Sequence, residues 1–496
     1  MSKITQQELE RYLWGSANIL RNAVDPEQYK RYIFPLLFLK RLNDVYDEET
    51  EKAVKAYGPE AANFEETHRF VIPDGAHWKD VRNVPENVGK AIQDAFRKIE
   101  NANSDKLAGI FGDGSWTNKN RLPDRLLKDL LEHFSIQTLS LENCPEDELG
   151  QGYEFLIRKF ADDSGHSAQE FYTNRTVVHL MTELLKPQPG ESIYDPTCGT
   201  AGMLISSIAY LKQHNLEWRN VSLYGQEVNA LSSAIARMNL FLHGIEDFDI
   251  KTGDTLLEPA FIENGQLQKF DMVVANPPYS IKNWNRDAFE KDKYGRNILG
   301  TPPKGRADYA FLQHILVSLD DKSGRCAILF PHGVLFRNEE SEMRKELVRK
   351  DLVECIIGLA PNLFYNSPME ACIMICKEDK KVDRRGQILF INAINEVERK
   401  NAQSYLKEEH IRKIADAFEN YQNVPGFAYK ATIKEVEDRG NLLSLPLYVR
   451  VDKPGGGTEY GSVRENYNKW RSSSMGAHIT LEHMNKPYNK EGTKYE

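Results

Sequence analysis

The sequence predicts an α/β fold in which an all-helical N-terminal domain precedes a mostly parallel β-sheet. Before about residue 150, apolar residues recur at helical spacing, and strand, turn and helix do not alternate. From Ile193 onward, short apolar runs alternate with helical stretches, which is typical of a parallel sheet covered by helices. We expect one of the later strands to be antiparallel. The six expected strands lie at Ile193, Leu223, Met272, 326–330, 352–359 and 371–376.

Helix-start signals mark the N-terminal part of the chain. Residues 5–8, Thr-Gln-Gln-Glu, have the form of a capping box ahead of a helix with one apolar face. Asp25-Pro26 indicates a second helix start, because proline is favoured in the first helical turn. Apolar spacing at 88–99 and 126–133 predicts further helices. We therefore expect a helical domain over residues 1–150.

A turn of small residues follows the first predicted strand. The strand 192–194 leads into Asp195, and a helix begins after the turn at Met203. Glycines let the backbone approach a ligand closely at the carboxyl end of a strand, the usual ligand crevice of a doubly wound sheet. The strict dinucleotide fingerprint is absent, which fits S-adenosylmethionine, a nucleoside cofactor without a pyrophosphate. The turn residues expected at this cofactor are Gly199, Thr200, Ala201 and Gly202.

Two acids stand at the ends of later predicted strands. Glu227 ends the strand 221–226, where a carboxylate can accept both ribose hydroxyls of a nucleoside cofactor. Asp254 follows 248–250 and could accept a hydrogen bond from the cofactor's adenine amine. The interval from Asp195 to Glu227 is longer than in nicotinamide enzymes, which disfavours a dehydrogenase. Either acid alone could be a solvated strand-end residue, but their order along the chain favours a cofactor site.

The residues Asn276, Pro277, Pro278 and Tyr279 end the apolar run 271–275. An exocyclic amine such as adenine N6 is a poor nucleophile, because its lone pair is delocalised into the ring. The Asn276 carboxamide oxygen and the Pro277 carbonyl could accept its two N–H bonds and stabilise a tetrahedral nitrogen as the new bond forms. Tyr279 offers a ring face for a base turned out of its stack. The alternative for these four residues alone is a structural turn that caps a buried strand.

Together these motifs resemble the modification (M) subunit of type I restriction–modification systems, a family of DNA adenine-N6 methyltransferases with the gamma motif order. The resemblance covers about residues 8 to 450. It includes 307–311, 362–365 and 445–449. The family usually has proline where this chain has Asn174. The segment that resembles the family's closure over the methionine end of the cofactor is Glu170, Phe171, Tyr172, Thr173, Asn174 and Arg175.

The resemblance implies a Rossmann-like, S-adenosylmethionine-dependent methyltransferase domain, here expected over residues 151–451. It implies methylation of adenine N6 in double-stranded DNA, with the target base flipped out of the helix. It also implies a specificity (S) subunit as partner, with two M subunits to one S subunit, and a restriction (R) subunit in the full complex. The polar tail 452–496 is the expected contact to the specificity subunit. We find no insert for target recognition, no Walker A string and no nuclease-like carboxylate cluster, so site choice and cleavage are expected elsewhere.

Composition is that of a cytoplasmic enzyme with more than one domain. The 496 residues exceed what one core usually serves, and the longest apolar run, 32–39, is too short to cross a bilayer. The six cysteines are scattered, and no His or Cys cluster supports a metal site. The net charge of −9 disfavours tight DNA binding by this chain without a partner. A local exception is 282–306, where seven basic residues stand against three acidic ones, so that a flexible loop could follow the phosphate backbone. On charge alone, an ordinary solvated surface loop is an equal alternative.

Two other functions remain open at this point. The motif Asn-Pro-Pro-Tyr also occurs in enzymes that methylate the N5 amide of a protein glutamine, although those enzymes are shorter. A catalytically decayed scaffold subunit is the second alternative, which the intact Asn276, Asp195 and Glu227 disfavour. Cytosine N4 is a lesser candidate for the target, because the same two acceptors would serve that amine. The DNA recognition sequence and any preference for hemimethylated DNA do not follow from these residues.

Overall fold

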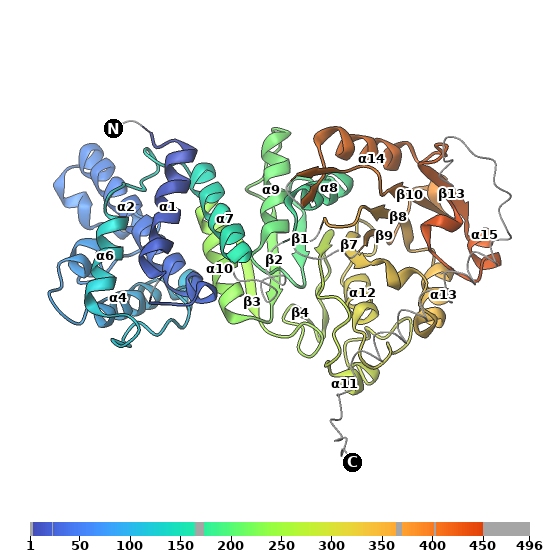
Figure 1. Ribbon diagram of the computed structural model, residues 1–496, viewed down its shortest axis with the longest axis horizontal. Coiled ribbons are helices and arrows are strands. Elements are labelled where there is room, and N and C mark those ends of the chain that lie inside the picture. Colours follow the sequence, from blue (N-terminus) through green and yellow to red (C-terminus); the bar gives the residue numbers. More distant parts are fainter. Residues whose placement is uncertain (1–2, 22, 164–172, 364–369, 401–402, 450–496) are drawn as a thin grey trace, which may run out of the picture. The chain divides into compact units, whose positions relative to one another are not determined.

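The computed structural model describes residues 3–21, 23–163, 173–363, 370–400 and 403–449 (Figure 1). Within these ranges the α/β prediction with an all-helical N-terminal part is confirmed, because every described strand lies at or after Ser192. No helix in the described ranges is long and apolar enough to cross a membrane. All six cysteines lie in described ranges, where they are free and buried.

The N-terminal helices pack around one apolar core, shown in blue to blue-green at the left of Figure 1. The expected capping box is present: Thr5 Oγ1 accepts from the Glu8 amide, and the Glu8 carboxylate accepts from the Thr5 amide. Helix α10 (Ala230–Leu242) adds Ile235 and Met238 to this core, so the helices are packed against the sheet region. The helices here are α1 (Gln6–Leu20), α2 (Lys30–Tyr57), α3 (Trp78–Arg82), α4 (Val88–Ala102), α5 (Ser104–Leu107), α6 (Asp124–Phe134) and α7 (Glu146–Asp163).

A nine-stranded sheet forms the centre of the described C-terminal part. It is mostly parallel, and two strands run antiparallel to their neighbours: β9 between β7 and β8, and β13 at the edge beside β10. One antiparallel strand was predicted from the sequence, whereas the sheet contains two. In spatial order the strands are β13 (Ala428–Thr432), β10 (Gln387–Ala393), β8 (Val353–Leu359), β9 (Ala371–Lys377), β7 (Arg325–Pro331), β6 (Met272–Ala275), β1 (Ser192–Asp195), β2 (Ser222–Glu227) and β3 (Phe248–Thr252).

Both faces of the sheet are buried, since alternate residues of one strand enter different cores. Along β6, Met272 and Val274 pack into one core, whereas Val273 and Ala275 pack into the other. One face is covered by α8 (Arg175–Leu185), α9 (Gly202–Gln213) and α14 (Glu408–Asn420). The other is covered by α12 (Asp308–Val317), α13 (Ser341–Arg349) and α15 (Ile433–Asp438). The remaining short elements are α11 (Arg286–Glu290) and the two-stranded ribbons β4–β5 (Ile262–Glu263, Gln266–Leu267) and β11–β12 (Glu398–Lys400, Gln403–Tyr405).

Candidate active site

The strand order reverses beside β1, which pairs with β2 on one side and with β6 on the other. In an open parallel sheet the crevice outside the carboxyl ends of such strands is where ligands bind. Asp195 ends β1, and Asn276 follows β6 directly. Strands β1 and β6 are neighbours, and Tyr194 is paired with Val273. Asp195 and Asn276 therefore stand at adjacent strand ends. The topology therefore brings the two main predicted motifs to one edge of the sheet.

The small-residue turn after β1 folds tightly against β2. The Cys198 amide donates to the Gln226 carbonyl at 3.0 Å. A side chain at Gly225 would press against Cys198, so the absence of one lets the turn approach. Gly199 and Ala201 both have left-handed backbone angles, with φ of 53° and 64°, and Ala201 is the N-cap of α9. The turn thereby directs its backbone over the edge of the sheet.

Asp195 is a buried carboxylate without a cationic partner among the described side chains. It is 2% exposed, and its Oδ1 accepts the Thr197 amide at 3.0 Å. Burial, and to a smaller extent the charge of Glu227, raises the pKa of Asp195 to about 7. A positively charged ligand group next to Asp195 would favour its ionised form.

Glu227 and Asp254 lie at the ends of the neighbouring strands. The Glu227 carboxylate accepts the Gly199 amide at 3.0 Å and the Asn229 amide at 2.8 Å. The Gly253 amide donates to the Glu227 carbonyl at 2.9 Å, which ties the two acidic segments together. Asp254 is exposed, and its Oδ1 accepts the amide of Leu256 at 2.9 Å, so it also shapes its own turn. Glu227 therefore borders the small-residue turn, and Asp254 directly follows the segment that is tied to Glu227.

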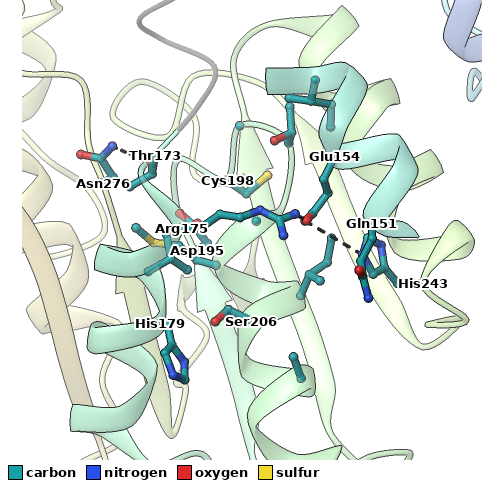
Figure 2. Close-up of a pocket in the computed structure, with 18 of the residues that line it drawn as sticks. Gln151, Glu154, Thr173, Arg175, His179, Asp195, Cys198, Ser206, His243 and Asn276 are labelled. Carbon is teal, nitrogen blue, oxygen red and sulfur yellow. Dashed lines mark hydrogen bonds and ion pairs between the residues drawn. The ribbon is translucent and has the colours of Figure 1, made fainter. Parts of the chain in front are cut away.

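The Asn276 side chain is oriented by a residue from a distant segment. Its Nδ2 donates to Thr173 Oγ1 at 2.9 Å (Figure 2). Its Oδ1 is buried and accepts no hydrogen bond from any described residue. A buried acceptor left in this state costs free energy unless a ligand donor reaches it. Pro277 is buried, Pro278 is exposed and Tyr279 is half-buried, and burial raises the pKa of Tyr279 well above its usual range.

A cavity of about 490 Å³ opens beside these residues. Seven predicted site residues line it: Thr173, Arg175, Asp195, Gly199, Thr200, Gly202 and Asn276. The other predicted residues in the described ranges do not line the cavity: Asn174, Ala201, Pro277, Pro278, Tyr279, Glu227 and Asp254. Glu170, Phe171 and Tyr172 lie outside the described residues.

Asn174, the departure from the family pattern, is a helix cap. Its Oδ1 accepts the Thr176 amide at 3.0 Å and so caps α8, while its Nδ2 donates to the Ser404 carbonyl at 3.0 Å. Asparagine is among the best N-cap residues, and proline at this position would supply neither contact. The loop that leads from Thr173 into α8 is therefore held by Asn174 itself.

Helix α7 supplies cavity residues that the sequence did not point to. Asp147, Gln151 and Glu154 lie on one face of α7 and line the cavity, and Glu154 pairs with Arg175 (Figure 2). His243 also lines it: burial lowers the pKa of this histidine to about 4, and its Nδ1 donates to the Asn239 carbonyl. The spacing of the three α7 residues, four and then three apart, was a usable signal, although polar residues on a helix usually indicate a solvated face.

Val228 is another residue near the predicted cofactor acids that was not singled out from the sequence. This valine directly follows Glu227 at the end of β2 and is 68% exposed. Leu257, in the turn after Asp254, is 48% exposed. Large apolar side chains exposed beside strand-end acids can contact a flat ring. The signal was present in the sequence as an apolar residue one position after Glu227 and three positions after Asp254.

The prediction of a flexible basic loop at 282–306 needs correction, because the segment is folded and its arginines are engaged. Arg296 is 2% exposed, pairs with Asp292 at 2.6 Å and donates to the Thr255 carbonyl at 2.9 Å. Arg286 donates to the Pro302 carbonyl, and Arg306 pairs with an exposed glutamate. Four exposed lysines form no ion pair with a described residue: Lys282, Lys291, Lys293 and Lys304.

Metal ligation finds no support in the described ranges, where no group of three or more His, Cys, Asp or Glu side chains could hold an ion. The chemistry of the site is that of buried hydrogen-bond acceptors at a switch point. Asn276 Oδ1 and Asp195 are buried acceptors, and the half-buried Glu227 carboxylate is a third.

Comparisons with known proteins agree with this geometry. The N-6 DNA methylase family model matches residues 145–454, and the HsdM N-terminal domain model matches residues 9–134. The MjaVII type I restriction enzyme methylase subunit of Methanocaldococcus jannaschii is 31% identical over 90% of this chain and 78% of its own. The HindI methylase subunit of Haemophilus influenzae is 31% identical over 76% of this chain and 89% of its own.

Among solved structures, a type I restriction–modification methyltransferase subunit from Streptococcus thermophilus has a TM-score of 0.78 at 28% identity. The match covers 90% of this chain and 100% of that chain. The matches span the helical region, the sheet and both motifs at the switch point. The chain therefore belongs to the N-6 DNA methylase family, among the methylase subunits of type I restriction enzymes.

Proposed function

We propose that the switch-point crevice binds S-adenosylmethionine and presents its methyl group to an adenine N6 held by Asn276. Membership of the family makes the chain an adenine-N6 DNA methyltransferase. The observation that carries the site assignment is the buried Asn276 Oδ1, an acceptor that no described residue satisfies.

The residues around the crevice fit this cofactor. Asp195 is buried and has no described cationic partner, so it would take the positively charged end of the cofactor. Glu227 would accept the ribose hydroxyls, and Asp254 the adenine amine, with Val228 against the adenine ring. When bound, the cofactor supplies an electrophilic methyl group. The remaining residues proposed to surround it are Thr173, Asn174, Arg175, Gly199, Thr200, Ala201 and Gly202, together with 170–172.

The catalytic groups act on the target amine. Asn276 Oδ1 and the Pro277 carbonyl would each accept one N–H bond of the adenine amine, which draws the nitrogen lone pair out of conjugation as the new bond forms. The hydrogen bond to Thr173 holds the carboxamide with Nδ2 toward the threonine, which would leave Oδ1 for the amine. Pro278 would restrict the backbone at Pro277, because the residue before a proline is confined in φ and ψ.

Base flipping brings the amine to these acceptors. An adenine inside a duplex cannot reach a pocket at the edge of the sheet, so the base would have to leave the stack. The half-buried Tyr279 ring would hold it by stacking. Replacement of Tyr279 by Phe or Trp is then expected to be milder than replacement by Ala, and Ala milder than Asp.

DNA would be held jointly with a specificity subunit, in a complex of two copies of this chain to one partner. A restriction subunit would join the full complex. The chain carries a net charge of −9, and its four unpaired lysines at 282–304 are the proposed local contact to phosphates. The tail 452–496, which lies outside the described residues, is the proposed contact to the specificity subunit. Such a complex would work in the cytoplasm, where its DNA lies.

The test is the product formed on long unmethylated DNA from labelled S-adenosylmethionine, with and without a co-purified specificity subunit. We expect N6-methyladenine in the nucleoside digest, and only when the partner is present. Efficient, site-specific methylation by the isolated chain would overturn the partner proposal. Label in N4-methylcytosine or in protein glutamine would overturn the assignment of the target.

A further inference from the structure

We propose that Asp308 is a positioning residue, which holds the catalytic loop in place by accepting the backbone N–H of Ser280. This inference rests on the proposed roles of residues 276–279 and deepens them. Asp308 is the first residue of α12 and is not among the residues that line the cavity. It would act on the reaction only through the loop.

The end of the catalytic loop needs an anchor. Ser280 directly follows Tyr279 and has a left-handed backbone with φ of 51°. A non-glycine residue in this region is strained, and such a conformation persists only where the surroundings impose it. Asp308 Oδ1 accepts the Ser280 amide at 3.0 Å. This contact joins the two ends of the 280–308 segment.

Asp308 is itself fixed from the opposite side. It is 1% exposed, and Arg337 Nη1 donates to its Oδ2 at 2.9 Å. A buried carboxylate needs such a partner, because an unpaired charge in the interior is costly. Arg337 passes over Gly333, where any side chain would overlap its guanidinium. Asp308 Oδ1 thus holds the loop backbone, whereas Oδ2 accepts from the arginine and, at 3.5 Å, from the Ser280 hydroxyl.

A second acid shares the arginine without touching the loop. Arg337 Nη1 also donates to Glu340 Oε1 at 3.2 Å. Burial raises the pKa of Glu340 to about 7, so this carboxyl is mostly protonated in mildly acidic solution. Of the two acids, Asp308 is the one in contact with the backbone of the catalytic loop.

A shift of the loop would move the Pro277 carbonyl and the Tyr279 ring together. Misplacement of reacting groups by about 1 Å can cost on the order of 10²-fold in rate. Cofactor binding depends on the other side of the crevice, at Asp195 and Glu227, and would be spared. The expected signature is therefore a slower chemical step with an unchanged affinity for S-adenosylmethionine.

The test compares Asp308→Asn with a matched buried acid, Glu354→Gln, in the complex with the specificity subunit. Glu354 is 4% exposed and pairs with Arg384 at 3.1 Å, but it lies at the amino end of β8, away from the catalytic strand ends. Each variant is assayed for thermal stability, cofactor affinity by calorimetry and single-turnover methyl transfer below its unfolding temperature. We expect both to lose stability, and only Asp308→Asn to lose rate, by about 10-fold to 10²-fold.

Arg337→Lys provides a second variant that keeps a cation beside Asp308, and its rate should fall less than that of Asp308→Asn. Wild-type rates in Asp308→Asn overturn the inference, as does a loss of rate matched by Glu354→Gln. A parallel loss of cofactor affinity in Asp308→Asn also overturns it, because the effect would then not be confined to the loop. Failure of the proposed function is distinguishable, since the wild-type complex itself would then methylate no adenine.

Discussion

Thr173 holds the Asn276 carboxamide in one orientation. The Asn276 Nδ2 donates to Thr173 Oγ1 at 2.9 Å, which leaves Oδ1 as a buried acceptor that no described residue fills. Thr173 precedes α8, whereas Asn276 follows β6, so two segments far apart in sequence meet at the proposed catalytic residue. A threonine hydroxyl can both donate and accept, so this contact fixes the position of the carboxamide, and Nδ2 is the atom that faces Thr173.

The first prediction concerns the hydrogen bond between Thr173 and Asn276. Thr173→Val keeps the shape of the side chain and removes the hydroxyl, so the loss should be that of one hydrogen bond, about 0.5–1.5 kcal/mol. Single-turnover methyl transfer should slow by about 2-fold to 10-fold, and Thr173→Ser should restore most of the rate. A valine variant as fast as wild type would mean that Asn276 is oriented without Thr173.

The second prediction concerns pH. Burial raises the pKa of Asp195 to about 7, whereas a bound cationic group favours the ionised form. Cofactor binding should therefore release a proton, and affinity should rise between about pH 6 and about pH 8. Calorimetry in buffers of different ionisation enthalpy measures the released protons, and Asp195→Asn should abolish the release. Proton-neutral binding by the wild type near pH 7 would contradict this role.

The same raised pKa affects the cofactor-free protein. A carboxyl whose folded pKa lies above its unfolded value contributes stability that is complete below the unfolded pKa, here 3.8. That contribution is lost as pH rises through about 7. Asp195→Asn should therefore unfold at a temperature that depends less on pH across this window.

The third prediction concerns the nucleoside end of the cofactor. Glu227→Ala should weaken S-adenosylmethionine binding by about 1.5–3 kcal/mol, through loss of charge-assisted hydrogen bonds. Val228→Asn should weaken it as well, whereas Val228→Leu should not, because an apolar contact to the adenine ring survives in leucine. Val382 is the matched control, since it is 82% exposed and lies between β9 and β10. Equal affinities for Val228→Asn and Val382→Asn would remove Val228 from the site.

The sequence could point to the main proposed site residues because each of them lies next to a strand end in the chain. Asp195 and Glu227 each end a strand, and Asn276 follows one, so their positions follow once the strands are recognised. The edge strands were harder to predict. β3 and β13 contain exposed or half-buried lysines, and a partly solvated edge strand lacks the continuous apolar run of a buried one.

What the sequence could not provide were contacts between distant segments. The basic charge of 282–306 suggested that Arg296 could lie on a loop that follows DNA. In the structure its guanidinium is buried against Asp292 and the Thr255 carbonyl. Likewise, the pairing of Glu154 with Arg175 depends on how α7 packs. The division of the chain near residues 150 and 451 stays a prediction.

The fourth prediction separates the two kinds of basic residue in 282–306. Replacement of Lys282, Lys291, Lys293 and Lys304 by glutamine should weaken DNA binding by the complex. The slope of log affinity against log salt should fall by about 0.9 for each phosphate contact removed. Lys322→Gln is the control, because this exposed lysine lies before the amino end of β7, at the opposite edge of the sheet. An unchanged slope in the fourfold variant would show that these lysines face solvent only.

The proposed chemistry depends above all on Asn276 as an acceptor for the target amine. The most direct measurement is single-turnover methyl transfer to adenine by Asn276→Ala, in complex with a specificity subunit and alongside calorimetric binding of S-adenosylmethionine. We predict cofactor affinity near that of the wild type and no detectable N6-methyladenine, because the lost acceptor acts on the amine and not on the cofactor. Wild-type turnover by a folded Asn276→Ala variant would contradict the account and leave residues 276–279 as a structural turn.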